Sequence, residues 1–177
     1  GINREKLAWV MDLKNSRRGR ISEYVDQFKG STYSAGKRPW EIKCEIALPS
    51  ATQNEIEKAD AQTLMDNGCI AISEGANMPS TPDAIEIYQA HKIAYGPAKA
   101  ANAGGVAVSA LEMTQGAAFD MWTREQVDAK LDQIMTSIHT ACASAADTYG
   151  EPGNLVMGAN AAGFIKVANA MMDQGLV

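Results

Sequence analysis

Residues 44–49 read CEIALP and form the first of three short apolar runs that decide the fold; CIAI follows at 69–72 and IAYG at 93–96. Short apolar runs bounded by proline or glycine are typical of buried β-strands. Pro49 stops the first run, and Gly96 ends the third. We therefore expect three short strands in the interior of a sheet.

The stretches between these runs have helical spacing. Residues 54–67 place apolar side chains on one helical face and stop at Gly68, and Thr81 begins a second helix with Pro82 at its first position. Connections that carry a helix join parallel strands, whereas an antiparallel pair needs only a tight turn. The pattern predicts a parallel, doubly wound α/β sheet.

The flanking segments are mainly helical. Residues 3–28 show helical spacing, and residues 31–34 are a candidate short strand. After residue 99 the strands stop. Three helices are expected there, at residues 101–118, 123–149 and 158–174. A capping box at Thr123 begins the second of them.

The predicted sheet is incomplete as a nucleotide-binding domain. A complete doubly wound domain has about six strands in two halves, and its first half carries a glycine-rich phosphate turn. Here only three or four strand candidates occur, GxGxxG is absent, and the segment 158–163 lacks the Lys-Ser/Thr of a Walker sequence. We therefore expect residues 1–100 to be the C-terminal half of a Rossmann-like dinucleotide-binding domain. Such a half-sheet has an exposed edge and apolar surface that favour self-association.

The composition is that of a globular protein and argues against several classes of partner. The chain has 177 residues, of which 46% are hydrophobic and 21% charged, and its formal net charge is −5. Acidic and basic residues alternate, without the basic face that a nucleic acid or an acidic membrane requires. The one basic cluster, Arg17, Arg18 and Arg20, is interpreted as a solvated helix end or turn. No apolar run approaches the roughly 20 residues that span a bilayer.

The cysteines indicate a reducing compartment. Cys44, Cys69 and Cys142 lie far apart in no zinc-ligand spacing, and their odd number argues against a disulfide framework. We expect reduced, buried thiols in a cytoplasmic protein that binds no metal. The chain begins at Gly1 with a helix opening instead of an initiator methionine, which suggests that another part of the protein precedes it.

Three loops follow the three apolar runs, and in a parallel sheet they meet at the carboxyl edge, where ligands bind. Residues 49–55 carry small and hydroxyl side chains, which either admit a ligand to the backbone or cap the next helix. Residues 73–82 are stiffened by two prolines, and Asn77 suits a carboxamide or ribose hydroxyl as well as a turn. Residues 95–109 are almost wholly small, which suits close ligand approach or tight packing of a helix on the sheet.

Four motifs resemble those of a known family. They are EGANMP at 74–79, KAANAGGV at 99–106, SALEM at 109–113 and GAN at 158–160. In this order and spacing they resemble the C-terminal, cofactor-domain half of hexameric glutamate dehydrogenases of the NADP-linked, bacterial type. The resemblance runs from Leu7 to Val177. It implies that residues 101–177 are a helical section that completes the cofactor domain and leads back to a substrate domain outside this chain.

The resemblance also implies an activity and residue roles. Such enzymes interconvert L-glutamate and 2-oxoglutarate plus ammonia with NADP(H), or alternatively NAD(H), and assemble as homohexamers. The positions that match residues along the ribose and nicotinamide of the cofactor are Ala51, Thr52, Gly75, Ala76, Asn77 and Asn102. Val106 and Ser109 match residues that contact the substrate side chain, with the serine hydroxyl near its distal carboxylate.

No catalytic residue is assigned to this chain. The family's catalytic lysine and aspartate, its glycine-rich turn and the residue that selects NAD or NADP match no position here, so we expect the isolated chain to be inactive. Two other interpretations stay open. A leucine- or phenylalanine-type dehydrogenase is one, although its apolar pocket should not place a hydroxyl at Ser109. The other is a non-catalytic, stand-alone nucleotide-binding or assembly module.

Overall fold

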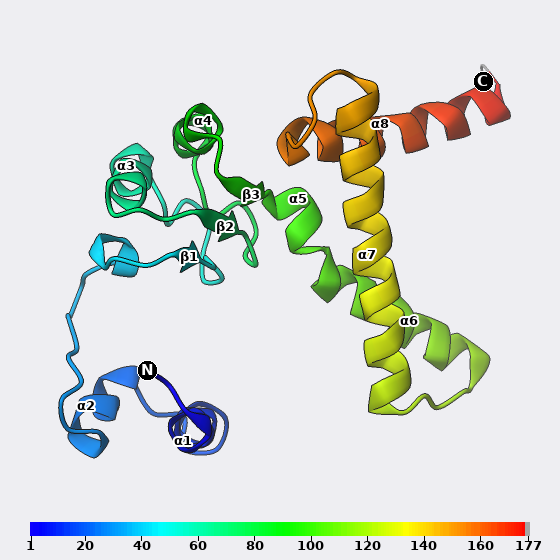
Figure 1. Ribbon diagram of the computed structural model, residues 1–177. Coiled ribbons are helices and arrows are strands. Elements are labelled where there is room, and N and C mark those ends of the chain that lie inside the picture. Colours follow the sequence, from blue (N-terminus) through cyan, green and yellow to red (C-terminus); the bar gives the residue numbers. More distant parts are fainter. Residues whose placement is uncertain (176–177) are drawn as a thin grey trace. The chain divides into compact units, whose positions relative to one another are not determined.

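The computed structural model describes residues 1–175, and these fall into two units (Figure 1). The first unit is Gly1–Arg38, and the second begins at Pro39. The first unit is wholly helical with connecting turns, whereas the second combines a small sheet with helices. Each unit is described below by itself.

Aromatic rings hold the first unit together. Its elements are α1 (Arg4–Asn15), the 3-10 helix η1 (Ile21–Glu23) and α2 (Tyr24–Gln27). The ring centroid of Trp9 lies 5.9 Å from that of Tyr24 and 5.6 Å from that of Phe28. Both pairs are edge-to-face, the arrangement that the ring quadrupole favours. These contacts pack α1 against the segment that contains α2.

Two predictions for this unit are wrong in part. The helix expected over residues 3–28 is interrupted between Asn15 and Ile21, a stretch in which Arg18 has a left-handed backbone (φ 55°) that a right-handed helix does not accommodate. The strand expected at residues 31–34 does not form. Its backbone takes part in a turn instead, because the Lys37 N–H donates to the Ser34 carbonyl at 3.3 Å.

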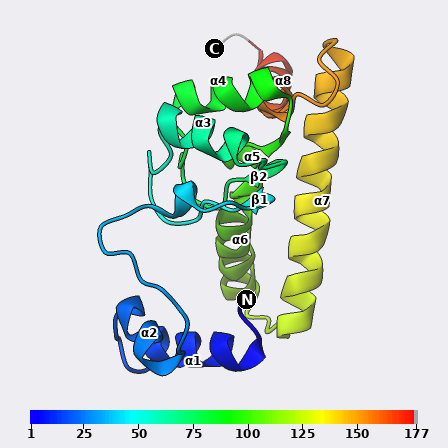
Figure 2. The same ribbon diagram turned by 60° about the vertical axis from the view of Figure 1, so that its left-hand side comes forward.

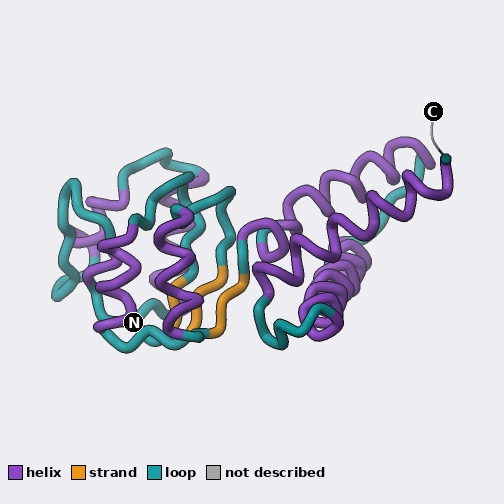
Figure 3. The backbone as a smooth tube through the Cα atoms, turned by 90° about the horizontal axis from the view of Figure 1, so that it is seen from above, coloured by secondary structure: helices purple, strands orange, loops and turns teal. Residues whose placement is uncertain are grey.

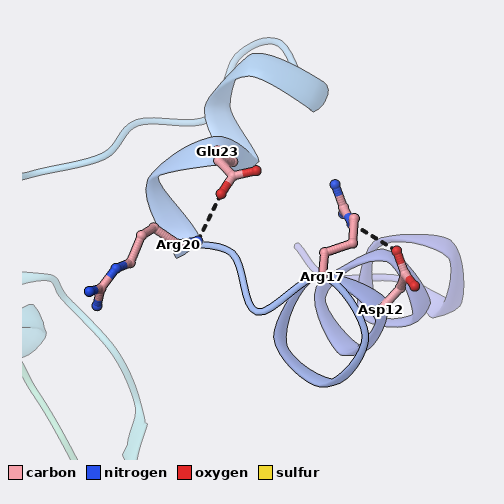
Figure 4. Close-up of polar contacts among 4 residues, drawn as sticks. All are labelled: Asp12, Arg17, Arg20 and Glu23. Atoms are coloured by element: carbon pink, nitrogen blue, oxygen red, sulfur yellow. Dashed lines mark hydrogen bonds and ion pairs between the residues drawn. The ribbon is translucent and has the colours of Figure 1, made fainter.

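The basic cluster is the turn between these helices, as the sequence predicted. Arg17, Arg18 and Arg20 are all exposed. In Figure 4 the guanidinium of Arg17 meets Asp12, with Nε and Oδ2 at 2.8 Å, and the Arg20 N–H donates to Glu23 Oε1 at 2.8 Å. Exposed pairs of this kind contribute little to stability, on the order of 0.5 kcal/mol.

A three-stranded parallel sheet forms the centre of the second unit. Its strands are β1 (Ile46–Ala47), β2 (Ala71–Ser73) and β3 (Ala94–Gly96), in the spatial order β1-β2-β3. Ala47 pairs with Ile72, and Ile72 pairs with Tyr95. All three strands were predicted from the apolar runs, and the parallel arrangement is confirmed.

One face of the sheet is covered by helices. These are α3 (Lys58–Asp66) and α4 (Pro82–His91), together with the short η2 (Pro39–Glu41). Figures 1 and 2 show α3 and α4 side by side on the same side of the strands. Leu64 of α3 and Tyr88 of α4 are completely buried, and Ile72 of the central strand is 1% exposed. These side chains form the core of the unit.

The opposite face of the sheet is open. On this face Ile46 is 59% exposed and Leu48 63%, whereas Ile70, 64% exposed, precedes β2 and lies outside the strand. Successive side chains of a strand point to opposite faces, so half of each apolar run lies on this side. The expectation that the apolar runs are buried is therefore correct for one face of the sheet and wrong for the other. The described part of the chain places α3 and α4 on one face only.

The first helix of the sheet begins later than predicted. Residues 54–67 were expected to be helical, but α3 starts at Lys58. The reason is tertiary: Ile56 forms a parallel bridge with Ser80, which keeps the preceding residues extended. The second helix agrees with the prediction, because Thr81 caps α4 by accepting a backbone N–H through its hydroxyl.

Helices alone make up the rest of the second unit (Figure 3). They are α5 (Ala98–Ala101), α6 (Ala103–Ala118), α7 (Arg124–Thr148) and α8 (Leu155–Gln174). The predicted helix over residues 101–118 divides at Asn102, which separates α5 from α6. The capping box is confirmed: the Thr123 N–H donates to Gln126 Oε1 at 2.8 Å, and the Gln126 N–H donates back to the Thr123 hydroxyl at 3.3 Å.

Helices α7 and α8 cross at a glycine. A Cβ atom on Gly158 would collide with the backbone carbonyl oxygen of Cys142 and would lie 3.2 Å from the Cβ atom of Ala146. Beyond this crossing α8 is largely exposed, with Phe164 73% and Met172 72% accessible. By length and composition, α8 is the one helix of the described chain that could cross a membrane, which the apolar-run analysis did not anticipate. Its hydropathy comes from its alanines and large apolar residues, whereas its close approach to α7 depends on Gly158.

Candidate functional site

The three loops that follow the strands are joined by hydrogen bonds at the carboxyl edge of the sheet. Loop 1 is residues 48–55, loop 2 is residues 74–80 and loop 3 is residues 97–102. The Pro49 carbonyl of loop 1 accepts the N–H groups of Gly75 and Ala76, at 2.9 and 3.1 Å. The side chain of Asn102 donates from Nδ2 to the Ala76 carbonyl at 3.0 Å. Positions far apart in sequence are thereby fixed next to one another.

In loop 1, the predicted ligand positions are exposed. Ala51 and Thr52 are both exposed, and the Ala51 N–H donates to Glu55 Oε1 at 3.1 Å. The alternative that Thr52 or Asn54 caps the next helix is wrong, because Glu57 is the N-cap residue of α3. The Thr52 hydroxyl therefore lies at the loop surface without a capping role.

In loop 2, close approach to loop 1 requires a glycine. A Cβ atom on Gly75 would lie 2.5 Å from Ser50 Oγ, inside van der Waals contact. Ala76 is buried, whereas Asn77 is exposed. The turn alternative for Asn77 finds no support, since its side chain makes no hydrogen bond among residues 1–175. Its amide is available both as donor and as acceptor.

The third loop continues into α6, whose first turns carry the remaining predicted residues. Asn102, Val106 and Ser109 are spaced i, i+4 and i+7, which places them on one helical face. Val106 is 70% exposed, and the Ser109 hydroxyl donates to the Gly105 carbonyl at 3.2 Å. This face is accessible from solvent.

Gly104 of α6 packs against another helix, so the tight packing at this small residue is not the helix-on-sheet packing that the sequence suggested. A Cβ atom here would lie 3.6 Å from Leu131 Cδ1 and 3.8 Å from Met135 Sδ, both on α7. Gly104 therefore faces α7, away from the face that carries Ser109. The glycine pair lies inside the first turn of α6 and does not precede the helix.

Sequence reasoning missed Glu74, which precedes Gly75 and is only 1% exposed. Its Oε2 accepts the Ala98 N–H at 2.9 Å, so it joins loop 2 to the start of α5. Burial, and next the negative charge of Glu74, raise the pKa of the Tyr95 hydroxyl well above its ordinary value. Burial also raises the pKa of Tyr88 to about 12, against the opposing effect of its 3.2 Å hydrogen bond with Ser80. In the sequence, the sign of a buried Glu74 was its position as an acidic residue between an apolar run and a glycine.

Two other features of the described residues bear on the chemistry of this surface. No cluster of His, Cys, Asp or Glu within residues 1–175 could hold a metal ion. A groove of about 770 Å³ lies among α5, α6, α7 and α8, and it contains none of the eight predicted site residues. At its rim Lys99 Nζ donates to Asn160 Oδ1 at 3.0 Å, which accounts for two of the conspicuous motif residues as a helix contact. The site is thus an open surface at the sheet edge.

A family model of the Glutamate/Leucine/Phenylalanine/Valine dehydrogenases matches residues 1–175. The chain belongs to this dehydrogenase family. The resemblance inferred from the four motifs is therefore confirmed at the level of the family. The small parallel sheet followed by helices also occurs in the part of a solved glutamate dehydrogenase that aligns with this chain.

Individual dehydrogenases of the family match closely over their shared length. Glutamate dehydrogenase of Bacteroides thetaiotaomicron is 56% identical over 177 residues, which is 100% of this chain and 40% of the relative. NADP-specific glutamate dehydrogenase of Escherichia coli is 49% identical, over 100% of this chain and 39% of the relative. The crystal structure of Plasmodium falciparum glutamate dehydrogenase aligns with a TM-score of 0.95 at 47% identity, over 100% of this chain and 38% of that one. The chain thus spans about 40% of the length of its curated relatives.

Proposed function

We propose that this chain is the cofactor-domain part of a glutamate dehydrogenase, which interconverts L-glutamate and 2-oxoglutarate plus ammonia with NADP(H). The observation that carries the proposal is the hydrogen-bonded set of loops 1, 2 and 3, which gathers the predicted cofactor positions at one sheet edge. Relatives named as glutamate dehydrogenases, 48–56% identical to the chain, support glutamate over leucine or phenylalanine. NADP is preferred because relatives from Escherichia coli, Haemophilus influenzae and Giardia intestinalis are NADP-specific, although that of Bacteroides fragilis is NAD-specific.

The residues of this chain orient the ligands in the proposed reaction. When bound, the nicotinamide supplies the hydride acceptor or donor. Ala51, Thr52, Gly75, Ala76, Asn77 and Asn102 would lie along its ribose and nicotinamide. The exposed amide of Asn77 and the small residues of loops 2 and 3 fit this role, because they offer hydrogen bonds and close approach to the backbone. Holding the reacting carbons in line is itself a large contribution to rate.

The face of α6 that carries Val106 and Ser109 would receive the substrate side chain. A valine provides apolar contact to its methylenes, and a hydroxyl can donate to a distal carboxylate. The proton-transfer groups of the family match no residue of this chain, and we propose that they come from the remainder of the enzyme. The intact enzyme is proposed to be a cytoplasmic homohexamer, while the isolated chain turns nothing over.

Replacing Ser109 tests the proposed substrate contact in the full-length enzyme. S109A removes one hydrogen bond to a charged group, so KM for glutamate should rise about 10- to 100-fold. KM for NADP should stay within twofold. T114A is the matched control, because the Thr114 hydroxyl also donates to a carbonyl four residues earlier, at 2.9 Å, and lies outside the proposed contact. Equal glutamate KM values in S109A and T114A would refute the assignment.

A further inference from the structure

Glu74 is a buried carboxylate that neither the motif analysis nor the proposed roles account for. It follows β2 directly and is 1% exposed. Moving a carboxylate from water into a protein interior costs several kcal/mol unless hydrogen bonds compensate for the lost water. Such a residue at the edge of a ligand-binding surface calls for a specific role.

Both the backbone and the side chain of Glu74 tie β2 to the chain beyond β3. Its N–H donates to the Gly96 carbonyl at 3.1 Å. Its Oε2 accepts the Ala98 N–H at 2.9 Å, across 24 residues of sequence. A charged acceptor on a backbone N–H makes one of the stronger protein hydrogen bonds. The separation between loop 2 and α5 is therefore fixed by this residue.

Together with two hydrogen bonds of Asn102, the contact between Glu74 and Ala98 forms a closed ring of contacts between loop 2 and α5. The Asn102 N–H donates to the Ala98 carbonyl at 3.0 Å, and the Asn102 side chain donates to the Ala76 carbonyl at 3.0 Å. Ala76 in turn follows Gly75 and Glu74 in the chain. The position of the Asn102 amide is thus determined from two sides, by α5 and by loop 2. Removing the Glu74 carboxylate opens the ring at one link.

The second carboxylate oxygen lies beside another buried polar group. Glu74 Oε1 and the Tyr95 hydroxyl are both buried, and within residues 1–175 neither has a partner at full hydrogen-bond geometry, although burial and, after it, the charge and a longer polar contact of Glu74 raise the pKa of the Tyr95 hydroxyl. The Tyr95 ring belongs to β3 and packs against Tyr88, with 5.1 Å between centroids. Tyr95 and Glu74 are thus close enough for the carboxylate to add to the effect of burial on the pKa of the Tyr95 hydroxyl, while Oε2 accepts the Ala98 N–H.

We propose that Glu74 is a positioning residue of the dehydrogenase: it holds α5 against loop 2 and thereby sets Asn102, Gly75, Ala76 and Asn77 in their places for the nicotinamide cofactor. This inference rests on the proposed function. It assigns no proton transfer to Glu74, which is too deeply buried to meet substrate. Its loss should weaken cofactor binding and turnover more than it weakens binding of glutamate alone.

Hydrogen exchange on the 177-residue chain tests the contact between Glu74 and Ala98 without an activity measurement. In E74M, which keeps side-chain volume without an acceptor, the Ala98 amide should exchange at least about tenfold faster than in wild type, and the Asn102 side-chain resonances should shift. E86M is the matched control, because Glu86 lies exposed on α4. Unchanged exchange at Ala98 in E74M would overturn the proposal.

Cofactor titration of the full-length enzyme tests the consequence. Kd for NADPH should rise about tenfold or more in E74M, stay within about threefold of wild type in E74Q, whose amide oxygen still accepts, and not change in E86M. Should E74M fail to fold, E74D replaces it, since its shorter side chain withdraws the oxygens from Ala98. Equal losses in E74Q and E74M, or a lower Tm with unchanged NADPH affinity, would overturn the positioning role. A wild-type enzyme that binds no NADPH would refute the proposed function, and faster Ala98 exchange would then mark Glu74 as a structural clamp only.

Discussion

Replacement of Gly158 by alanine should destabilise the second unit, although alanine is the better helix former. The added Cβ would collide with the carbonyl oxygen of Cys142 and approach Ala146 Cβ to 3.2 Å. The first of these is a backbone atom inside α7 and cannot rotate away. The two helices must therefore separate or shift along each other, which breaks the close contact between them.

The magnitude follows from two opposing contributions. Exchanging glycine for alanine inside a helix stabilises it by about 1 kcal/mol. Overpacking a well-packed contact costs about 1–3 kcal/mol, and a backbone neighbour places Gly158 at the upper end of that range. A net loss of about 2 kcal/mol is expected, which lowers the urea midpoint by about 1 M for an m-value of about 2 kcal/mol/M.

Urea denaturation of the 177-residue chain, followed by circular dichroism, measures this loss. G163A on the same helix is the matched control, because its Cβ would meet only the flexible end of Lys99, at 3.9 Å. G163A should leave the midpoint unchanged or raise it. If G158A proved as stable as G163A, the helix crossing could not be as tight as the collision with Cys142 implies, and the reasoning would be refuted.

Two further perturbations probe loop contact and alkaline stability. In the full-length enzyme G75A should raise KM for the cofactor several-fold, because the added Cβ would lie 2.5 Å from Ser50 Oγ. The additional substitution S50G removes that oxygen and should restore most of the loss. If S50G leaves the KM of G75A unchanged, this contact is not the cause. The free energy of unfolding should fall as the pH rises from 10 to about 12, since burial raises the pKa of Tyr88 from 10.0 to about 12. The folded state disfavours the phenolate, so this stability, on the order of 2 kcal/mol, is complete below pH 10 and is lost above it. Urea titrations across this pH range should show a shallower fall in Y88F, and an identical slope would argue against Tyr88.

The order of strands and helices was predictable because its signals are local. Apolar runs, helical spacing and caps such as Thr81 and Thr123 act within a few residues of themselves. The exposure of Ile46 and Leu48 was not predictable in this way, since an apolar run does not say which face of the sheet a later helix covers. The delayed start of α3 has the same origin, because it depends on the bridge between Ile56 and a residue in the next loop.

In the candidate site, too, local features were predictable from the sequence and long-range contacts were not. Its exposed members could be named from motifs, because short patterns such as EGANMP carry a family's local chemistry. Glu74 could not be recognised as a clamp, because its partner Ala98 lies 24 residues away and contributes only a backbone N–H. Almost any residue type can supply a backbone N–H, so a side chain that binds backbone groups has no recognisable partner in the sequence. The ring through Asn102 therefore becomes visible only in three dimensions.

The crossing at Gly158 makes α7 a lever. This helix has 25 residues, and about 18 of them separate its first turn from Cys142, a span of about 27 Å. A tilt of about 5° at the crossing would carry the far end of α7 through about 2 Å, by simple geometry on that span. Because Gly104 of α6 rests on Leu131 of α7, such a tilt would also turn the helix that presents Val106 and Ser109. We expect substrate preference in the proposed full-length enzyme to respond to substitutions at the Gly158 crossing, which is not among the predicted ligand positions.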